Sequence, residues 1–409
     1  MRVALIHDWL NGMRGGEKVL ETLCELFPEA VIFTLFYQPE KVSSKISSHE
    51  VRTSFLDKIP GVRRSYRNLL PLYPKAMEAL QIDGFDICIS VSHSVAKGIR
   101  PGPHCLHLCI CLTPMRYIWD RFDDYFGDKE SGQLKRYLAR ILCMRLRRWD
   151  VQSSSRVDLF ISISEFVKRR IAKFYDRPST VIYPFADTNY FTPAVIEKSH
   201  KGRSNNKNTG YFLVVSALVP YKRVLDVVEA FKHIDEKAII VGDGPEKKKL
   251  MDTAPSNVEF TGWISDEHLL RLYRGCKALI FPGVEDFGIV PVEAQACGKP
   301  ILALAEGGTI ETVTGPIIGI DEIDSSNATG LFFRKSNPEY IIEAIKKYKE
   351  LKFDPRIIRE NALRFSRDNF AESIMAFINE SYDRFKADGR AGLETKMVGY
   401  NQFANKLEY

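Results

Sequence analysis

The feature that most constrains the fold is the stretch at residues 281–300, FPGVEDFGIVPVEAQACGKP. A short apolar run at residues 278–281 is typical of a buried parallel strand, and a polar turn at residues 282–288 follows it. Pro291 suits the first turn of a helix, where its missing N–H is not needed, and the final Cys-Gly-Lys-Pro predicts the end of that helix. This order of strand, loop and helix start predicts an anion site, because free N–H groups and the helix dipole point at a ligand there.

Two glutamates in this stretch, Glu285 in the loop and Glu293 in the helix, can bracket one ligand from two directions. Carboxylates do not bind phosphate, but they accept charge-assisted hydrogen bonds from sugar hydroxyls. We therefore interpret the stretch as a site for a nucleotide sugar, with the phosphate on the backbone and sugars on either side. The alternative is an ordinary strand-loop-helix unit whose glutamates face water.

The spacing Glu285-x7-Glu293, with Asp286-Phe287-Gly288 and the Glu-Ala-x-Ala-x-Gly-x-Pro continuation, resembles the signature of the family 4 retaining glycosyltransferases, the glycosyl transferases group 1. The resemblance implies an α/β protein of GT-B fold, in which two Rossmann-like, doubly wound domains face each other across a cleft. It also implies a nucleotide-diphosphate sugar as donor, with no cofactor and no metal.

Segments in the N-terminal half resemble one subgroup of this family. Residues 71–78, 92–98 and 113–120 are similar to those of a bacterial subgroup related to O-antigen mannosyltransferases. The resemblance spans roughly residues 1–385, which covers nearly the whole chain.

The alternation of apolar strands with helix-like runs predicts two α/β domains, which fits a chain of 409 residues. We expect an acceptor-binding domain at residues 1–190 and a nucleotide-sugar-binding domain at residues 191–370. The polar, turn-rich residues 196–209 predict a linker or an exposed loop. The resemblance implies that a helix at about residues 371–388 packs back on the N-terminal domain, and residues 389–409 are expected to form a tail.

Glycines that follow expected strands are assigned to the donor site. Gly15 and Gly16 lie in a loop after the first expected strand, where they let the backbone approach a pyrophosphate closely. A tight turn is the alternative, and the resemblance favours the donor. The other residues assigned to the donor are Gly242, Gly262, Trp263, Phe287, Gly288, Ile289, Val290 and Glu293.

Cationic side chains are needed to stabilise the charge that develops on a departing diphosphate. Lys222 and Arg223 stand between an expected strand and an expected helix, and the resemblance implies that Lys222 contacts the diphosphate; a solvated basic turn is the alternative. The residues assigned to catalysis are Glu285, Lys222, Arg223 and His93. Those assigned to the acceptor side are Arg116, Tyr117 and Lys97.

Two positions depart from the family pattern. The family usually has an arginine five positions before the lysine, where this chain has Ala217, and often a histidine directly before residues 113–114, where it has Leu112. The candidates to replace these groups are Arg223, Arg116, Lys97 and His93. The departures leave open that the chain is an inactive homologue.

The charge chemistry of the sequence agrees with a metal-independent reaction, since the chain contains no Asp-x-Asp triplet. Retention of the anomeric configuration is inferred from the resemblance alone. No residue stands out as the carboxylate nucleophile of a double displacement, so front-side attack by the acceptor is the hypothesis.

Three functions compete. The leading one is transfer of mannose from GDP-mannose to a lipid-linked or polysaccharide acceptor in cell-surface glycan synthesis. A nucleotide-sugar 2-epimerase shares the two-domain architecture but needs acid–base carboxylates in the N-terminal domain. A catalytically weak homologue that binds other proteins is the third. A dehydrogenase is disfavoured because the first loop lacks Gly-x-Gly-x-x-Gly.

Composition limits the partners and the location. A net charge of +6, with 45% hydrophobic and 27% charged residues, is ordinary for a soluble protein and too small to predict nucleic-acid binding. No run approaches about 18 apolar residues and the start lacks a signal-peptide cleavage pattern, so a cytoplasmic protein is expected.

Two basic segments with interspersed apolar residues, 63–75 and 134–149, predict peripheral contact with an anionic membrane at its inner face. The alternative is packing helices with a solvated basic face. The eight cysteines fall mostly in apolar segments and are expected to be buried and reduced; the His and Cys residues at 104–111 lack the C-x2-C pair of a metal site.

Overall fold

The computed structural model describes residues 1–62, 66–122, 133–194, 210–322 and 325–393. The chain divides into two compact units, of which unit 1 comprises Met1–Tyr183 and Phe370–Tyr409, and unit 2 comprises Pro184–Asn369. The expected linker at residues 196–209, the expected tail from residue 394 on and part of the first basic segment lie outside the described residues.

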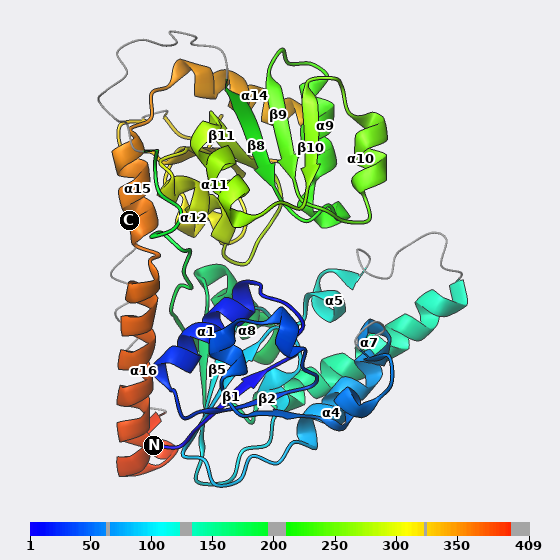
Figure 1. Cartoon of the computed structure of the whole chain (residues 1–409), viewed down its shortest axis with the longest axis vertical. Helices are drawn as coiled ribbons and strands as arrows, with labels where there is room; N and C mark the ends of the chain where they lie inside the picture. The colour runs from blue at the N-terminus through cyan, green and yellow to red at the C-terminus, as the bar shows by residue number, and fades with distance from the viewer. Residues whose placement is uncertain (63–65, 123–132, 195–209, 323–324, 394–409) are drawn as a thin grey trace. The chain divides into compact units, whose positions relative to one another are not determined.

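Unit 1 is built on a sheet of seven parallel strands in the order β3-β2-β1-β4-β5-β6-β7. Figure 1 labels β1, β2 and β5 of this sheet. The strands β1, β4 and β5 are buried along their whole length, as expected for a parallel sheet covered on both faces. The order reverses between β1 and β4, so the carboxyl ends of these two strands form the switch point where ligands bind in such sheets. The strands are β1 (Val3–His7), β2 (Val31–Thr34), β3 (Val51–Thr53), β4 (Ile87–Ser92), β5 (Leu106–Cys111), β6 (Leu159–Ser162) and β7 (Ser179–Val181).

The helices of unit 1 connect these strands. Capping fixes where they begin: the hydroxyl of Ser164, for example, accepts the N–H of Val167 at 3.0 Å and starts α8. The helices are α1 (Gly15–Leu26), α2 (Ser44–Ser47), α4 (Tyr73–Glu78), α5 (Arg116–Trp119), α7 (Gln133–Ser154), α8 (Glu165–Tyr175) and, from Phe370 on, α16 (Arg367–Asp388). Short 3-10 turns are η1 (Pro39–Lys41), η2 (Phe55–Lys58), η3 (Tyr66–Leu72) and η4 (Ala96–Gly98).

The C-terminal helix α16 is fastened to unit 1 by an apolar stripe and a terminal arginine. Phe370, Ile374 and Phe377 recur at helical spacing and are buried. Just beyond the helix, Arg390 donates to Asp158 at 2.7 Å and to the carbonyl oxygen of Pro103 at 2.7 Å. From Phe370 on, the chain therefore belongs to unit 1 again.

Unit 2 is a sheet of six parallel strands in the order β10-β9-β8-β11-β12-β13, and its switch point lies between β8 and β11. One apolar cluster that includes Phe212, Phe231 and Phe333 forms its core. The strands are β8 (Tyr211–Val215), β9 (Lys237–Val241), β10 (Val258–Gly262), β11 (Ala278–Phe281), β12 (Ile301–Leu304) and β13 (Gly330–Phe333). The helices are α9 (Val224–Phe231), α10 (Lys247–Thr253), α11 (Asp266–Gly275), α12 (Ile289–Ala296), α13 (Thr309–Thr312), α14 (Pro338–Glu350) and α15 (Pro355–Leu363), with the 3-10 turn η5 (Pro220–Lys222).

Two parallel-sheet, Rossmann-like units confirm the predicted fold class. The strand, loop and helix expected around residues 278–300 are β11, the loop at residues 282–288 and α12. All eight cysteines are free and buried, as expected, and burial raises the pKa of the Cys24 thiol, for example, to about 12. Within the described residues, no helix is both long enough and apolar enough to cross a bilayer.

Candidate functional site

Two of the predicted catalytic residues meet in unit 2. Lys222 closes η5, the turn after β8, and Glu285 lies in the loop after β11. Because β8 and β11 are parallel neighbours, both loops emerge at the carboxyl edge of the sheet, at its switch point. Lys222 Nζ and Glu285 Oε1 form an ion pair, with 13% and 19% of the two side chains exposed. The sequence indicated both residues, and the structure adds that they are partners.

Glycines let the loops of this edge pack backbone against backbone. A Cβ on Gly242, after β9, would lie 1.9 Å from the carbonyl oxygen of Ser216, after β8. A Cβ on Gly308, after β12, would lie 2.3 Å from the carbonyl oxygen of Asp286, and the N–H of Gly308 donates to the carbonyl of Glu285 at 2.7 Å. A side chain at either glycine would push apart the loops that hold the ion pair.

A helix start and a buried hydroxyl belong to the same edge. Gly288, at the N-terminus of α12, has φ +94°, and a Cβ there would lie 3.5 Å from Thr309 Oγ1. Thr309 is fully buried, and its hydroxyl has no hydrogen-bond partner among the residues that the structure describes. Ile289 and Val290, whose N–H groups open α12, are partly exposed. Free N–H groups beside a buried hydroxyl suit an anion such as a phosphate.

Glu293, in α12, is hydrogen-bonded inside unit 2. Its side chain lies in the interior, with the residue 7% exposed, and its Oε2 accepts the hydroxyl of Tyr273 at 3.0 Å. Burial, together with the charge of Glu293, raises the pKa of Tyr273 well above its ordinary value. Contact of Glu293 with the same ligand as Glu285 stays a prediction, since the Glu293 carboxylate already accepts the Tyr273 hydroxyl of α11. Phe287 is buried too, edge-on against Phe365.

The remaining candidates of unit 2 are Arg223, which was assigned to catalysis, and the donor-side residues Gly262 and Trp263. Arg223, with φ 59°, is directed to the start of α9, where its guanidinium binds Asp226 Oδ2 at 2.7 Å and the carbonyl oxygen of Ser336 at 2.8 Å. The structure thus does not bring this arginine into the ion pair. Gly262 ends β10 with φ +71°, and Trp263 after it is 82% exposed.

In unit 1 the switch point is organised by Asp8, which sequence reasoning missed. Asp8 follows β1 directly and is fully buried. Its carboxylate accepts four backbone N–H groups of the loop after β4, those of His93, Ser94, Val95 and Ala96, at 2.5–3.0 Å. Burial opposes the charge, but the His93 ring and the N–H groups outweigh it and lower the pKa of Asp8 to about 2. The available signal was an acidic residue at the end of a buried strand.

His93 is held by this carboxylate. Its Nδ1 lies 2.9 Å from Asp8 Oδ2, and 31% of its side chain is exposed. Because a carboxylate only accepts, Nδ1 carries the proton. Burial lowers the pKa of His93, and the charge of Asp8 raises it by more, so the net shift is upward. Trp9 packs edge-on against the ring, with 4.7 Å between the ring centroids.

Gly15 and Gly16 open α1. A Cβ on Gly16 would lie 2.8 Å from Leu112 Cδ1 and 3.3 Å from His7 Nε2. The close approach that the glycines permit is therefore used to seat the start of α1 against the ends of β1 and β5. Contact of Gly15 and Gly16 with a donor stays a prediction.

Two acceptor-side candidates, Arg116 and Tyr117, lie half-buried at the start of α5. The hydroxyl of Tyr117 shares a hydrogen bond of 2.7 Å with Ser94 Oγ, and burial raises the pKa of this phenol well above its ordinary value. Tyr117 thus contacts the same loop that carries His93.

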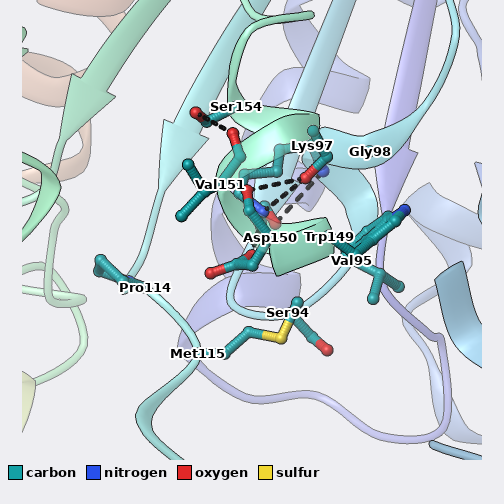
Figure 2. Close-up of polar contacts among 12 residues, drawn as sticks. Ser94, Val95, Lys97, Gly98, Pro114, Met115, Trp149, Asp150, Val151 and Ser154 are labelled. Carbon is teal, nitrogen blue, oxygen red and sulfur yellow. Dashed lines mark hydrogen bonds and ion pairs between the residues drawn. The ribbon is translucent and has the colours of Figure 1, made fainter. Parts of the chain in front are cut away.

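The third acceptor-side candidate, Lys97, is buried instead. It is 1% exposed in η4, and its Nζ pairs with Asp150 Oδ1 of α7 and donates to Ser153 Oγ at 3.1 Å (Figure 2). Asp150 also accepts Trp119 Nε1 at 2.8 Å and the hydroxyl of Tyr175 at 2.9 Å. The prediction that Lys97 faces an acceptor is therefore corrected: the lysine neutralises a buried carboxylate.

Comparison with known proteins relates part of the chain to a known family. The model of the family described as Glycosyl transferases group 1 matches residues 195–365. An uncharacterized glycosyltransferase of Methanocaldococcus jannaschii is 29% identical over 235 residues, which cover 55% of this chain and 59% of that protein. A GDP-mannose-dependent monoacylated alpha-(1-6)-phosphatidylinositol monomannoside mannosyltransferase of Corynebacterium glutamicum is 30% identical over 185 residues, or 40% of this chain and 48% of that protein. These matches span about half the length of the curated relatives.

Solved structures extend the likeness to nearly the whole chain. Anabaena HepE in complex with UDP has a TM-score of 0.64 at 16% identity, over 93% of this chain and 100% of that one. A sucrose-phosphate synthase of Thermosynechococcus elongatus also has a TM-score of 0.64 at 16% identity, over 94% and 100%. At this identity the likeness shows the fold, which is the GT-B fold that the sequence predicted.

Proposed function

We propose that this chain, whose residues 195–365 match the model of the glycosyl transferases group 1, is a retaining glycosyltransferase of that family. It transfers mannose from GDP-mannose to a lipid-linked or polysaccharide acceptor in cell-surface glycan synthesis. The observation that carries the proposal is the ion pair of Lys222 and Glu285 at the switch point of unit 2. The choice of GDP-mannose is supported by the Corynebacterium glutamicum relative, whose name specifies that donor.

The carboxyl edge of unit 2 suits the donor. In the reaction, the bond between the sugar C1 and the diphosphate oxygen breaks, the acceptor oxygen bonds to C1, and the acceptor proton passes to the departing diphosphate. Negative charge grows on the diphosphate, where Lys222 and the N–H groups that open α12 stabilise it. Glu285 accepts hydrogen bonds from hydroxyls of the sugar. In this proposal Lys222 binds the diphosphate of the nucleotide sugar, and Glu285 binds its sugar.

The carboxylates at the switch point of unit 1 support front-side attack. Asp8 is fully buried and saturated by N–H groups, and Glu17 is 3% exposed with its Oε2 accepting the N–H of Arg14 at 3.1 Å. Because both carboxylates bind backbone N–H groups of unit 1, we assign neither as a nucleophile or as an acid–base group of a 2-epimerase.

Helix α7 is suited to the proposed peripheral contact with an anionic membrane. Its sequence contains one acidic residue, Asp150, and this is buried against Lys97. A helix face of exposed arginines and apolar side chains, without an exposed acid, is complementary to anionic lipid. The exposed apolar side chains are Leu134, Tyr137, Leu138, Met144 and Val151. The exposed arginines are Arg136, Arg140, Arg145 and Arg148.

Donor titration tests the proposal. Calorimetry with GDP-mannose, UDP-glucose and UDP-N-acetylglucosamine compares the wild type with Lys222→Ala and Glu285→Gln. Lys237→Ala is the matched control, because Lys237 forms an exposed pair with Glu259 at 2.9 Å in the same unit. We expect one of the three donors to bind to the wild type. Its affinity should fall about tenfold or more in Lys222→Ala and Glu285→Gln, and it should stay unchanged in Lys237→Ala. Slow release of free sugar should accompany binding.

Two outcomes contradict this proposal. No donor binds, or one donor binds equally to all four proteins. Either result would favour the alternative that the chain is a catalytically weak homologue that binds other proteins.

A further inference from the structure

Two histidines at the switch point of unit 1 lie in opposite environments. His7 ends β1 and His93 follows β4, and their ring centroids are 6.2 Å apart. His7 is fully buried, with Nδ1 2.9 Å from the carbonyl oxygen of Trp9 and Nε2 without a hydrogen-bond partner in the described part of the chain. His93 is partly exposed and is held through Nδ1 by Asp8.

Asp8 is fixed in position before it meets the imidazole. Backbone N–H groups of Ser94, Val95 and Ala96 bind both of its oxygens, so the carboxylate cannot turn away from the His93 ring. Its Oδ2 accepts the proton of His93 Nδ1, which leaves Nε2 as the ring nitrogen that can meet a ligand. The His93 ring is thus oriented by an acceptor that is itself fixed. Because His93 follows β4, the exposed part of its ring lies at the carboxyl edge of the sheet.

We propose that Asp8 is a positioning residue that holds His93 as an imidazolium and presents its Nε2–H as a hydrogen-bond donor to a ligand oxygen at this switch point. The identity of that oxygen, a phosphate or hydroxyl oxygen of the glycosyl transfer reaction, rests on the proposed function. The arrangement of carboxylate and imidazole does not rest on it. Asp8 acts here through His93 and touches no ligand.

The charged groups that face His93 come from the two elements packed against its loop. From β1 and its end come Asp8, which favours the charged ring, and His7, whose pKa is lowered by burial. From the start of α1 come Glu17, which also favours the charge, and Arg14, which opposes it. Two imidazoles this close do not readily carry charge together, so the proton resides on His93 and His7 stays neutral.

Nitrogen NMR of the full chain tests the proposal without any substrate. Protein labelled with 15N in its imidazoles is titrated, and the His93 signals are identified by their loss in His93→Gln. We expect His93 to titrate above its ordinary value of 6.5, with Nδ1 protonated in the neutral ring, while the His7 signals stay those of a neutral ring. In Asp8→Asn, the His93 midpoint should fall by about one pH unit or more.

The Asp8→Asn variant loses an acceptor of backbone N–H groups, so the loop after β4 can unfold in it. The wild-type spectrum can overturn the proposal without this variant. A His93 midpoint below 6.5, or a neutral ring protonated on Nε2, contradicts it. The second readout is the pH profile of sugar release from the donor. The rate of sugar release should fall as pH rises through the His93 midpoint. In His93→Gln the rate should be lower and independent of pH in this range, and the control His233→Gln, at an exposed histidine, should keep the wild-type profile.

A His93→Gln profile with the wild-type shape also overturns the proposal. If no donor is turned over at all, the glycosyltransferase proposal has failed, and the NMR titration still decides whether Asp8 holds His93 charged.

Discussion

Lys222 and Glu285 form an ion pair, although one follows β8 and the other follows β11. The pairing places a cation and a carboxylate side by side at the one point of the sheet where the strand order reverses. A ligand that engages both must offer an anionic group to the lysine and hydrogen-bond donors to the glutamate. A sugar linked to a diphosphate has both, so the pair, and not either residue alone, is the basis of the proposed substrate class.

The first prediction concerns the lysine in the chemical step. We expect Lys222→Ala to lower kcat for sugar release about a hundredfold or more, because the growing charge on the diphosphate loses its cation. The matched control is Glu259→Gln, which breaks the exposed pair with Lys237 and should leave kcat unchanged. Steady-state kinetics with the donor identified by titration provides the measurement. A kcat within twofold of the wild type would exclude this role for Lys222.

The second prediction concerns the glycine contacts that hold the loops together. Gly308→Ala places a Cβ 2.3 Å from the carbonyl oxygen of Asp286, so the loop after β12 must move away from the loop that carries Glu285. We expect a loss of about 1–3 kcal/mol in the free energy of unfolding and weaker donor binding. Gly12→Ala is the control, because its nearest neighbours would be at 3.8 Å. Urea unfolding measures the free energy of unfolding, and calorimetry measures the affinity for the donor. If both quantities are the same in Gly308→Ala as in Gly12→Ala, the contact between the loops is unimportant.

Local signals were enough to predict much of the fold. The strand, loop and helix at β11 and α12 follow from an apolar run, turn residues and a proline in the first helical turn. Gly288 was expected in a ligand loop, and its φ of +94° shows why a glycine stands there. Lys222 and Glu285 were both indicated from their positions after strands. That they pair with each other depends on strand order, which no local pattern contains.

The burial of three charged residues, which the sequence did not predict, has one physical cause. Lys97, Glu293 and Asp8 are charged, and charge in a loop or helix usually indicates an exposed side chain. In the structure, each is buried because a partner distant in the sequence satisfies it: Asp150 for Lys97, Tyr273 for Glu293 and the loop after β4 for Asp8. Burial of a charge is a property of tertiary pairing, so a single sequence without the fold does not reveal it.

The third prediction measures the buried pair of Lys97 and Asp150. Lys97→Ala leaves a carboxylate in the interior without its cation, and we expect a loss of about 3–5 kcal/mol in the free energy of unfolding. Lys168→Ala removes a partly exposed pair with Glu165 in the same unit and should cost about 1 kcal/mol or less. Urea denaturation followed by circular dichroism compares the two variants. Similar losses for both would show that the Lys97 pair has no special weight.

The fourth prediction concerns α7 and anionic lipid. The double variant Arg140→Glu/Arg148→Glu reverses two exposed charges on this helix and should weaken binding to phosphatidylglycerol-containing vesicles by more than tenfold, at about 1 kcal/mol for each charge removed. The control reverses two exposed arginines of unit 2, Arg271→Glu/Arg356→Glu, and should bind as the wild type does. Vesicle flotation at two salt concentrations gives the measurement. Equal loss in both double variants would mean that net charge, and not α7, controls the binding.

The fifth prediction gives the pH dependence of stability at the switch point of unit 1. The pKa of Asp8 is about 2 in the folded protein against 3.8 ordinarily, so its contribution is present above pH 3.8 and is lost as pH falls through about 2. A shift of this size corresponds to about 2 kcal/mol. The pKa of His93 is raised, so its contribution is present in full below 6.5 and is lost as pH rises through its folded pKa.

Together the two groups should stabilise the fold most between about pH 4 and pH 6.5. Urea unfolding across this range tests both limbs: His93→Gln should remove the decline above pH 6.5 and, because the His93 ring is a main cause of the low pKa of Asp8, should also reduce the decline below pH 3.8. Exposed His233→Gln is the control and should keep both limbs. If His93→Gln retains the decline above pH 6.5, the imidazolium at Asp8 is not its source.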